Sequence, residues 1–381
     1  MRKVLHYDQL ADARILVRVP NWVGDAVLCL PALRALRRSL PEAELVLLAR
    51  PWVADVLPVE ELRCRLLHYD TRSTHRGLAG RLRIASQLRS QRFSAAILFQ
   101  NAFDAALISW LARIPVRAGY SRQGRGPLLT HGVRPPRRGE TPVHEAHYYL
   151  GMLRRLGLIP GYEPVEQISL PASEESLATG RLQLAERLAQ SSNTTEAPRW
   201  VVGISPGASF GTAKRWPAER FAELASRLVR ELGAACVFFG SPQEQQLVAD
   251  VIARSAIPSL SLAGQTSLSE FMGLVQGCDL FLTNDTGTMH VAAGLGVPTL
   301  ALFGPTNEQE TRPLGPHAKL LVGEAFCRPC KLRHCPIDHR CMKSLSVERV
   351  FQAARSMLLQ KPSDARVPVL QATAERSGSL S

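Results

Sequence analysis

Residues Phe281 to Thr306, FLTNDTGTMHVAAGLGVPTLALFGPT, predict a strand, a polar turn, a short helix and a second strand. The two strands, Leu280 to Thr283 and Thr299 to Phe303, are mostly apolar, which is typical of a buried parallel sheet. The turn from Asn284 to Thr288 lies between a strand end and a helix start, where open α/β sheets bind anions through free N–H groups and the helix dipole. This segment alone leaves an anion site and an ordinary capped helix as alternatives.

Apolar strands followed by helical patterns recur along the 381 residues. The further expected strands are Arg14–Val19, Glu44–Ala49, Ser94–Phe99, Trp200–Ile204, Ala234–Phe239 and Ser259–Ala263. Alternating strands and helices indicate parallel sheets covered on both faces, and the length favours two domains. We therefore predict two doubly wound Rossmann-like α/β domains, 1–171 and 200–360, with their strand ends facing a cleft. Residues 172–199 are expected to connect them, and 361–381 to form a disordered tail.

The composition is that of a globular protein, with 45% apolar and 21% charged residues. No apolar run approaches the roughly 18 to 20 residues of a membrane helix. The amino-terminal residues lack the apolar core of a signal peptide. We expect a cytoplasmic protein.

The net charge of +13 lies entirely in the first half of the chain, because residues 1–160 hold 25 basic and 12 acidic side chains. Nearly all of these cations are arginine, which suits bidentate contacts to phosphate or carboxylate. The asymmetry favours a polyanionic partner for the first domain, although an arginine-rich genome is the simpler alternative. A nucleic-acid partner is not expected, because aromatic residues are only 6% of the chain and no stacking module accompanies the cations.

Four of the eight cysteines cluster, with spacings of two, four and five residues between Cys327, Cys330, Cys335 and Cys341. Such a cluster in a cytosolic protein more often binds metal than forms disulfides. The second and third spacers are shorter than those of common zinc ribbons, so a structural zinc site and free thiols both remain open.

A second loop has the composition of a pyrophosphate cradle. Between Gly207 and Lys214 it contains two glycines, the hydroxyls of Ser209 and Thr212, and one lysine, but not the spacing of a Walker A motif. Glu244 follows a neighbouring expected strand, where a carboxylate is placed to accept ribose hydroxyls. Together with the Asn284–Thr288 turn, these positions predict a nucleotide diphosphate site in the second domain.

Four blocks carry a family resemblance: PNWVGDAVLCLPALRAL (Pro20 to Leu36), SPGASFGTAKRWP (Ser205 to Pro217), FGSPQE (Phe239 to Glu244) and NDTGTMHVAAGLGVPTLALFGPT (Asn284 to Thr306). Together they resemble the ADP-heptose:lipopolysaccharide heptosyltransferases, glycosyltransferase family 9, and most closely the heptosyltransferase II branch. The resemblance implies a GT-B fold of two domains and an inverting transfer of heptose from ADP-heptose to the first heptose of the lipopolysaccharide inner core. The cysteine cluster is not among the family's motifs.

The resemblance also implies residue roles. Asp25 corresponds to the general base, although from local sequence a helix N-cap is equally possible. Lys214 resembles the lysine that holds the donor phosphates, and Ser209 and Thr212 lie nearby. Glu244 resembles the glutamate that binds the ribose. The expected contacts to the pyrophosphate and the transferred sugar are Asp285, Thr286, Gly287, Thr288 and His290. For His290 the alternative is that its side chain simply packs inside its helix. The chain has no Asp-x-Asp triplet, so we expect catalysis without a metal or other cofactor.

The acceptor implied by the resemblance is an anionic lipid A–Kdo–heptose molecule. The loop GYSRQGRG, Gly119 to Gly126, is suited to an anion, and Arg122 and Arg125 are its candidate acceptor ligands; a plain surface turn is the alternative. The arginine-rich first domain also suggests peripheral contact with the anionic inner leaflet. Three alternatives stay open, namely another transferase of this fold (heptosyltransferase I or III included), a nucleic-acid-binding protein, and a nucleotide-binding regulator without catalysis.

Overall fold

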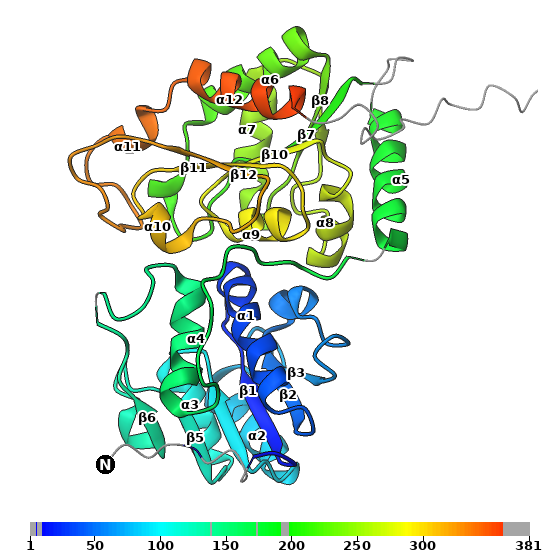
Figure 1. Cartoon of the computed structure of the whole chain (residues 1–381). Coiled ribbons are helices and arrows are strands. Elements are labelled where there is room, and N and C mark those ends of the chain that lie inside the picture. Colours follow the sequence, from blue (N-terminus) through cyan, green and yellow to red (C-terminus); the bar gives the residue numbers. More distant parts are fainter. Residues whose placement is uncertain (1–4, 6–9, 138, 173, 192–197, 361–381) are drawn as a thin grey trace, which may run out of the picture. The chain divides into compact units, whose positions relative to one another are not determined.

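The computed structural model describes residues 5, 10–137, 139–172, 174–191 and 198–360, so the expected disordered tail lies outside the described residues. The described residues form two compact units. The first unit holds the chain up to Leu170, and the second holds most of the chain from Pro171 onward. Each unit is an α/β structure built on its own sheet (Figure 1).

The sheet of the first unit has six parallel strands in the order β3-β2-β1-β4-β5-β6. These strands are β1 (Arg14–Arg18), β2 (Glu44–Ala49), β3 (Arg65–His68), β4 (Ala95–Leu98), β5 (Val116–Tyr120) and β6 (His131–Val133). Its helices are α1 (Val23–Ser39), α2 (Gly77–Ser90), α3 (Phe103–Leu111) and α4 (Glu145–Leu156), with the 3-10 turns η2 (Pro51–Val56) and η3 (Gly126–Leu128).

Helices cover both faces of this first sheet. Helix α1 packs against α4, and α2 packs against α3. Leu16 of β1 belongs to the core that contains Ile84 of α2 and Ala106 of α3. Its neighbours Ile15 and Val17 point to the opposite face and are equally buried. The apolar runs in the sequence therefore reflect strands buried on both sides, as parallel sheets require.

The second unit repeats this plan with the strand order β12-β11-β10-β7-β8-β9, again all parallel. Its strands are β7 (Trp200–Ser205), β8 (Ala234–Phe238), β9 (Leu260–Ser261), β10 (Leu280–Asn284), β11 (Thr299–Phe303) and β12 (Ala318–Val322). Its helices include α5 (Glu174–Ser191), α6 (Ala218–Leu232), α7 (Gln245–Ser255), α8 (Leu268–Val275) and α9 (Gly287–Gly294). The remaining elements of this unit are α11 (Arg340–Lys343), α12 (Val347–Leu359), η4 (Thr212–Lys214) and η5 (Pro242–Glu244). The short helix α10 (Glu308–Thr311) begins in the second unit, whereas its residues Gln309–Thr311 are grouped with the first.

In both sheets the chain starts in the middle, winds to one edge, and then returns to build the other edge. The direction reverses between β1 and β4 in the first unit, and between β7 and β10 in the second. Ligands of doubly wound folds bind beside the carboxyl ends of the two strands at such a reversal. This topology places the loops after β7 and β10 next to each other, although about 80 residues separate them in the sequence.

The expected α/β class is confirmed, whereas four strands were not predicted. Strand β3 is largely exposed, β6 has three residues, and β12 carries a lysine, so none shows a continuous apolar run. Strand β5 includes Gly119 and Tyr120, which the sequence places in a glycine-rich loop. Edge strands bury less surface than central ones, which weakens their sequence signal.

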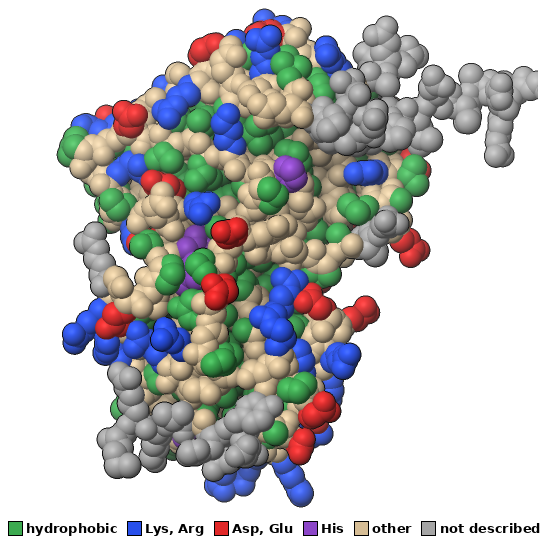
Figure 2. Space-filling model, in the orientation of Figure 1, with side chains coloured by type: hydrophobic (Ala, Val, Ile, Leu, Met, Phe, Trp, Pro, Cys, Tyr) green, Lys and Arg blue, Asp and Glu red, His purple; other side chains and the backbone are tan. Residues whose placement is uncertain are grey.

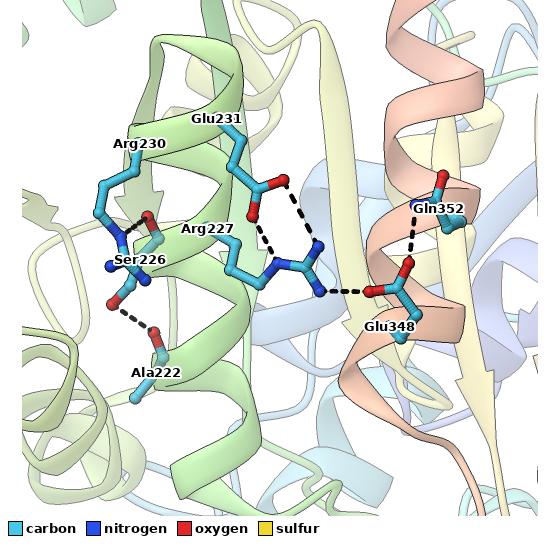
Figure 3. Close-up of polar contacts among 7 residues, drawn as sticks. All are labelled: Ala222, Ser226, Arg227, Arg230, Glu231, Glu348 and Gln352. Atoms are coloured by element: carbon cyan, nitrogen blue, oxygen red, sulfur yellow. Dashed lines mark hydrogen bonds and ion pairs between the residues drawn. The ribbon is translucent and has the colours of Figure 1, made fainter.

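Helix α12 is attached to α6 by a polar cluster on the surface of the second unit (Figure 3). Arg227 of α6 donates to Glu231 on its own helix and to Glu348 on α12, each at 2.6 Å. Its guanidinium also lies 4.0 Å from the ring centroid of Phe351. The two carboxylates raise the pKa of Arg227. Arg227 thus links the two helices through its ion pair with Glu348 and its contact with the Phe351 ring.

Candidate active site

The two polar loops predicted to bind a nucleotide diphosphate are neighbours in the second unit. Strand β10 pairs with β7 in a register that sets Thr283 beside Ser205. The loop that begins at Pro206 and the turn that begins at Asp285 therefore leave adjacent strands at the same edge of the sheet. We call Pro206–Lys214 the donor loop.

Asn284, at the end of β10, ties the donor loop to the turn. Its side-chain amide donates to the carbonyl oxygens of Pro206 at 2.8 Å and Gly207 at 3.2 Å. Its amide oxygen accepts from the backbone N–H of Trp216 at 3.1 Å. One fully buried side chain thus holds both ends of the donor loop. The sequence places Asn284 in the predicted turn but does not indicate this bridging role, because the contacts join residues at least 68 positions apart.

Lys214 and Asp285 form a largely buried ion pair. The Nζ atom of Lys214 lies 2.6 Å from Oδ2 of Asp285, and the two side chains are 13% and 5% exposed. The hydroxyl of Thr306, which follows β11, donates to the same carboxylate oxygen at 2.6 Å. The structure therefore brings Lys214 and Asp285 together as one charged centre, and it adds Thr306, which the sequence did not indicate.

The first turn of α9 follows this centre directly. Thr286 is the N-cap residue, and the helix begins at Gly287. The Oγ1 atom of Thr288 is buried and has no hydrogen-bond partner among the described residues. His290 is buried, with 6% of its surface exposed. The start of a helix favours phosphate through the helix dipole and the N–H groups that lack a partner within the helix.

The carboxylate of Glu244 is held against the donor loop. Its Oε2 atom accepts from the backbone N–H of Ser241 at 2.9 Å and from the Ser241 hydroxyl at 2.8 Å, which forms a capping box. A Cβ added to Gly207 would lie only 2.0 Å from the other oxygen, Oε1. A side chain at position 207 would therefore displace the Glu244 carboxylate. Ser209 and Thr212 lie on the exposed part of the same loop.

Asp25 lies in the first turn of α1, where Trp22 occupies the N-cap position. The N-cap alternative for Asp25 is therefore wrong, because the residue is already inside the helix. Asp25 is half-buried, and its neighbours include Cys29 and, from α4, Tyr149. Burial is the main reason why the pKa of the Cys29 thiol and of the Tyr149 phenol is raised, and the charge of Asp25 adds to it.

The loop that leads into α1 is clamped by side chains that the sequence did not indicate. The Asn21 side-chain oxygen accepts from Arg18 and from Arg50, and its backbone oxygen accepts from the Trp52 indole at 2.9 Å. Both guanidinium groups also face the Tyr69 ring, at 5.5 Å for Arg18 and 4.2 Å for Arg50. Burial lowers the pKa of Arg18 to about 9, and the charge of Arg50 contributes. These contacts fix the backbone just before Asp25.

The two arginines expected to bind the acceptor have different environments. Arg125 is fully buried, and burial lowers its pKa to about 10. It donates to the carbonyl oxygens of Tyr120 and Gln100 and to the Asn101 side chain. Direct contact with an acceptor is therefore not supported for Arg125, which instead braces the strand ends. Arg122 is exposed and donates to the Tyr148 hydroxyl at 3.1 Å.

The four clustered cysteines are free thiols in the segment after β12. The N–H of His339 donates to the sulfur of Cys335 at 3.3 Å, and burial raises the pKa of Cys341, with the other three thiols adding to the shift. Among the described residues, however, no three His, Cys, Asp or Glu side chains form a group that could hold a metal.

Comparison with known proteins places the chain in a family. A model of glycosyltransferase family 9 (heptosyltransferase) matches residues 81–340. The chain belongs to this family. Lipopolysaccharide heptosyltransferase 2 of Salmonella typhimurium is 31% identical over 364 residues, which cover 91% of this chain and 99% of that protein. Its counterpart from Escherichia coli K12 is 29% identical over 362 residues, with the same coverage.

Solved structures agree with this membership. The structure of E. coli ADP-heptose lps heptosyltransferase II matches with a TM-score of 0.71 and 28% identity, covering 91% of this chain and 99% of that one. A family 9 glycosyl transferase from Veillonella parvula matches with a TM-score of 0.79 and 26% identity, over 94% of this chain and all of that one. The expected family and the two-domain Rossmann-like architecture are thus confirmed. Within the described residues, no helix is long and apolar enough to span a membrane.

The zinc site at the four cysteines stays a prediction. Elemental analysis of the purified full chain checks it, with about one zinc per chain expected if the site forms. The quadruple Cys→Ser variant is the control, and less than a tenth of an equivalent of any metal in the wild type would contradict the site.

The contact between Gly207 and Glu244 generates a second prediction. In Gly207→Ala the new Cβ forces the Glu244 carboxylate away from the donor loop, whereas the backbone of Gly207 is not in the left-handed region and accepts alanine. We expect ADP binding to weaken about 10-fold, because a charge-assisted hydrogen bond is lost, with little change in thermal stability. Calorimetric titration with ADP measures this effect. Gly161→Ala is the control, since nothing lies within 4 Å of its added Cβ; equal affinity in both variants would contradict a nucleotide contact by Glu244.

Proposed function

We propose that this protein is an inverting glycosyltransferase that transfers heptose from ADP-heptose to the first heptose of the lipopolysaccharide inner core. The observation that carries the proposal is the alignment, along 91% of the chain, with relatives named heptosyltransferase 2. The geometry of the second unit supports the donor class, because Lys214, the start of α9 and Glu244 combine features that bind phosphates and a ribose.

In the proposed reaction Asp25 removes the proton from the acceptor hydroxyl. The oxygen then forms a bond to the anomeric carbon of the heptose while the bond from that carbon to the ADP phosphate oxygen breaks. Attack from the face opposite ADP inverts the configuration. ADP gains negative charge as it leaves, and Lys214 and the N–H groups near Gly287 stabilise that charge. The electrons of the broken bond depart with ADP, and the proton stays on Asp25.

The position of Asp25 supports its role as the base. Asp25 lies in the first turn of α1, where a carboxylate interacts favourably with the helix dipole. The clamp around Asn21 holds the preceding loop, so the carboxylate starts from a rigid backbone.

Mutations can separate donor binding from general base catalysis. We expect Asp25→Ala to bind ADP as the wild type does and to lose about 100- to 10,000-fold in transfer rate, because general base catalysis contributes that much. Lys214→Ala should weaken ADP binding itself. Turnover is measured with ADP-heptose and lipid A–Kdo acceptors that bear either no heptose or one heptose.

These assays also distinguish the alternatives. Transfer only to the acceptor without heptose indicates the activity of a heptosyltransferase I. If Asp25→Ala transfers heptose as fast as the wild type, Asp25 is not the base. ADP binding without any transfer indicates a regulator, and a salt-sensitive DNA shift without ADP binding indicates a nucleic-acid-binding protein.

We further propose that α2 contacts the anionic membrane that carries the acceptor. The helix exposes Leu78 and Leu82, at 67% and 51%, next to the exposed guanidinium groups of Arg76 and Arg83. Basic side chains beside exposed apolar ones are the features of an interfacial helix. Basic side chains, which are all arginines among the described residues of the first unit, are also visible on this unit (Figure 2).

Vesicle sedimentation tests this contact. We expect the wild type to bind vesicles of phosphatidylglycerol and phosphatidylcholine more tightly than phosphatidylcholine alone, and to lose binding in 0.5 M salt because charges are screened. The variant L78S/L82S should bind about 10-fold more weakly. The control is Leu182→Ser, which removes an exposed leucine from α5. The assignment to α2 is contradicted if L78S/L82S and Leu182→Ser lose vesicle binding equally, or if L78S/L82S loses none.

A further inference from the structure

The cysteine-rich segment, residues 327–341, packs directly on the donor loop. The backbone N–H of Ala213 donates to the carbonyl of Arg333 at 3.1 Å. The hydroxyl of Thr212 lies 3.1 Å from Nδ1 of His334. A Cβ on Gly211 would lie 2.2 Å from the Arg333 carbonyl oxygen, so only glycine permits this approach. The segment therefore has a defined place beside residues that we assign to the donor.

The side chain of Arg333 reaches the same loop as its backbone does. Its Nε atom donates to the carbonyl of Phe210 at 2.7 Å. Its guanidinium carbon lies 5.3 Å from the centroid of the Phe210 ring, and Nζ of Lys214 lies 5.1 Å from that centroid. One aromatic ring thus holds two cations from segments about 120 residues apart. Nη1 and Nη2 have no hydrogen bond to the described part of the chain, so they can serve a ligand.

The charge of the donor site favours a second cation. Lys214 is paired with Asp285 at 2.6 Å, so the pair has no net charge. The pyrophosphate of a nucleotide sugar carries a negative charge on each phosphate, and departure of ADP adds more. Of the cations described at the donor loop, Arg333 is exposed and has the planar fork that binds phosphate oxygens in pairs.

We propose that Arg333 is a further donor-binding residue, which the cysteine-rich segment supplies to the pyrophosphate of the nucleotide sugar. This assignment rests on the proposed donor site in the second unit. Stacking on Phe210 holds the guanidinium before the ligand arrives, which reduces the entropy lost on binding. The cysteine-rich segment then serves the reaction by placing one arginine.

Arg333→Gln is the decisive variant, because glutamine still offers an N–H to the Phe210 carbonyl but carries no charge. Arg340→Gln is its matched control: Arg340 lies in the same segment, pairs with Asp338 at 3.0 Å and stacks on Phe326 at 4.9 Å, but makes no described contact with the donor loop. The full chain is titrated by calorimetry with ADP, AMP and adenosine, and thermal unfolding of each variant is recorded.

For Arg333→Gln we expect ADP affinity to fall about 10-fold, AMP affinity to fall less, and adenosine affinity to stay unchanged. Arg333→Lys should recover part of the ADP affinity, since it restores the charge without the fork. Arg340→Gln should match the wild type. An equal loss for ADP, AMP and adenosine would show that Arg333 only braces the loop, and would overturn the proposal.

Failure of the assignment is distinguishable from failure of the proposed function. A wild type that binds ADP, together with an Arg333→Gln variant of unchanged ADP affinity, overturns the assignment alone. A wild type that binds no ADP overturns both.

Discussion

The donor site depends on one buried ion pair, that of Lys214 and Asp285. Removing both groups from water is costly, and the pair is maintained because Thr306 donates to the same carboxylate oxygen. Loss of either charge would leave the other buried and uncompensated, which costs about 3–5 kcal/mol in comparable pairs. The ammonium group is therefore fixed before any ligand binds. In a site that is already organised, little free energy is spent on reorganising the protein when charge develops on the leaving group.

Asn284 gives this centre its geometry because its amide both donates and accepts. The side chain donates to two carbonyls at the start of the donor loop and accepts from one N–H beyond its end. A carboxylate of the same shape would face two carbonyl oxygens with no proton to give them, so aspartate cannot replace it. The neighbouring Asp285 makes the opposite set of contacts, accepting from a cation and a hydroxyl. Two residues of almost equal shape are thus distinguished by their hydrogen-bonding partners.

The sequence predicted the parts of the fold whose signal is local. The strand, turn and helix from Leu280 to Gly294 were expected because apolar runs and a polar turn follow each other directly. Asn284, Thr306 and Arg333 carried no such signal, since each acts on residues distant in the chain. Arg125 shows the converse error: a charged residue in a glycine-rich loop suggests exposure, but its guanidinium is buried and donates to backbone carbonyls at the strand ends. Burial of arginine depends on the backbone acceptors around it, which only the folded chain brings together.

The first unit holds the loop before Asp25 with two like charges. Arg18 and Arg50 share the ring of Tyr69 and the side-chain oxygen of Asn21, an arrangement that repulsion opposes. Carbonyl acceptors and the Tyr69 ring, whose hydroxyl donates to Asp104 at 3.0 Å, offset that repulsion. Because Asn21 accepts from both cations, the loop before Asp25 has little freedom to move without leaving a buried guanidinium unpaired. The orientation of the proposed base is thus set by contacts that do not include its own carboxylate.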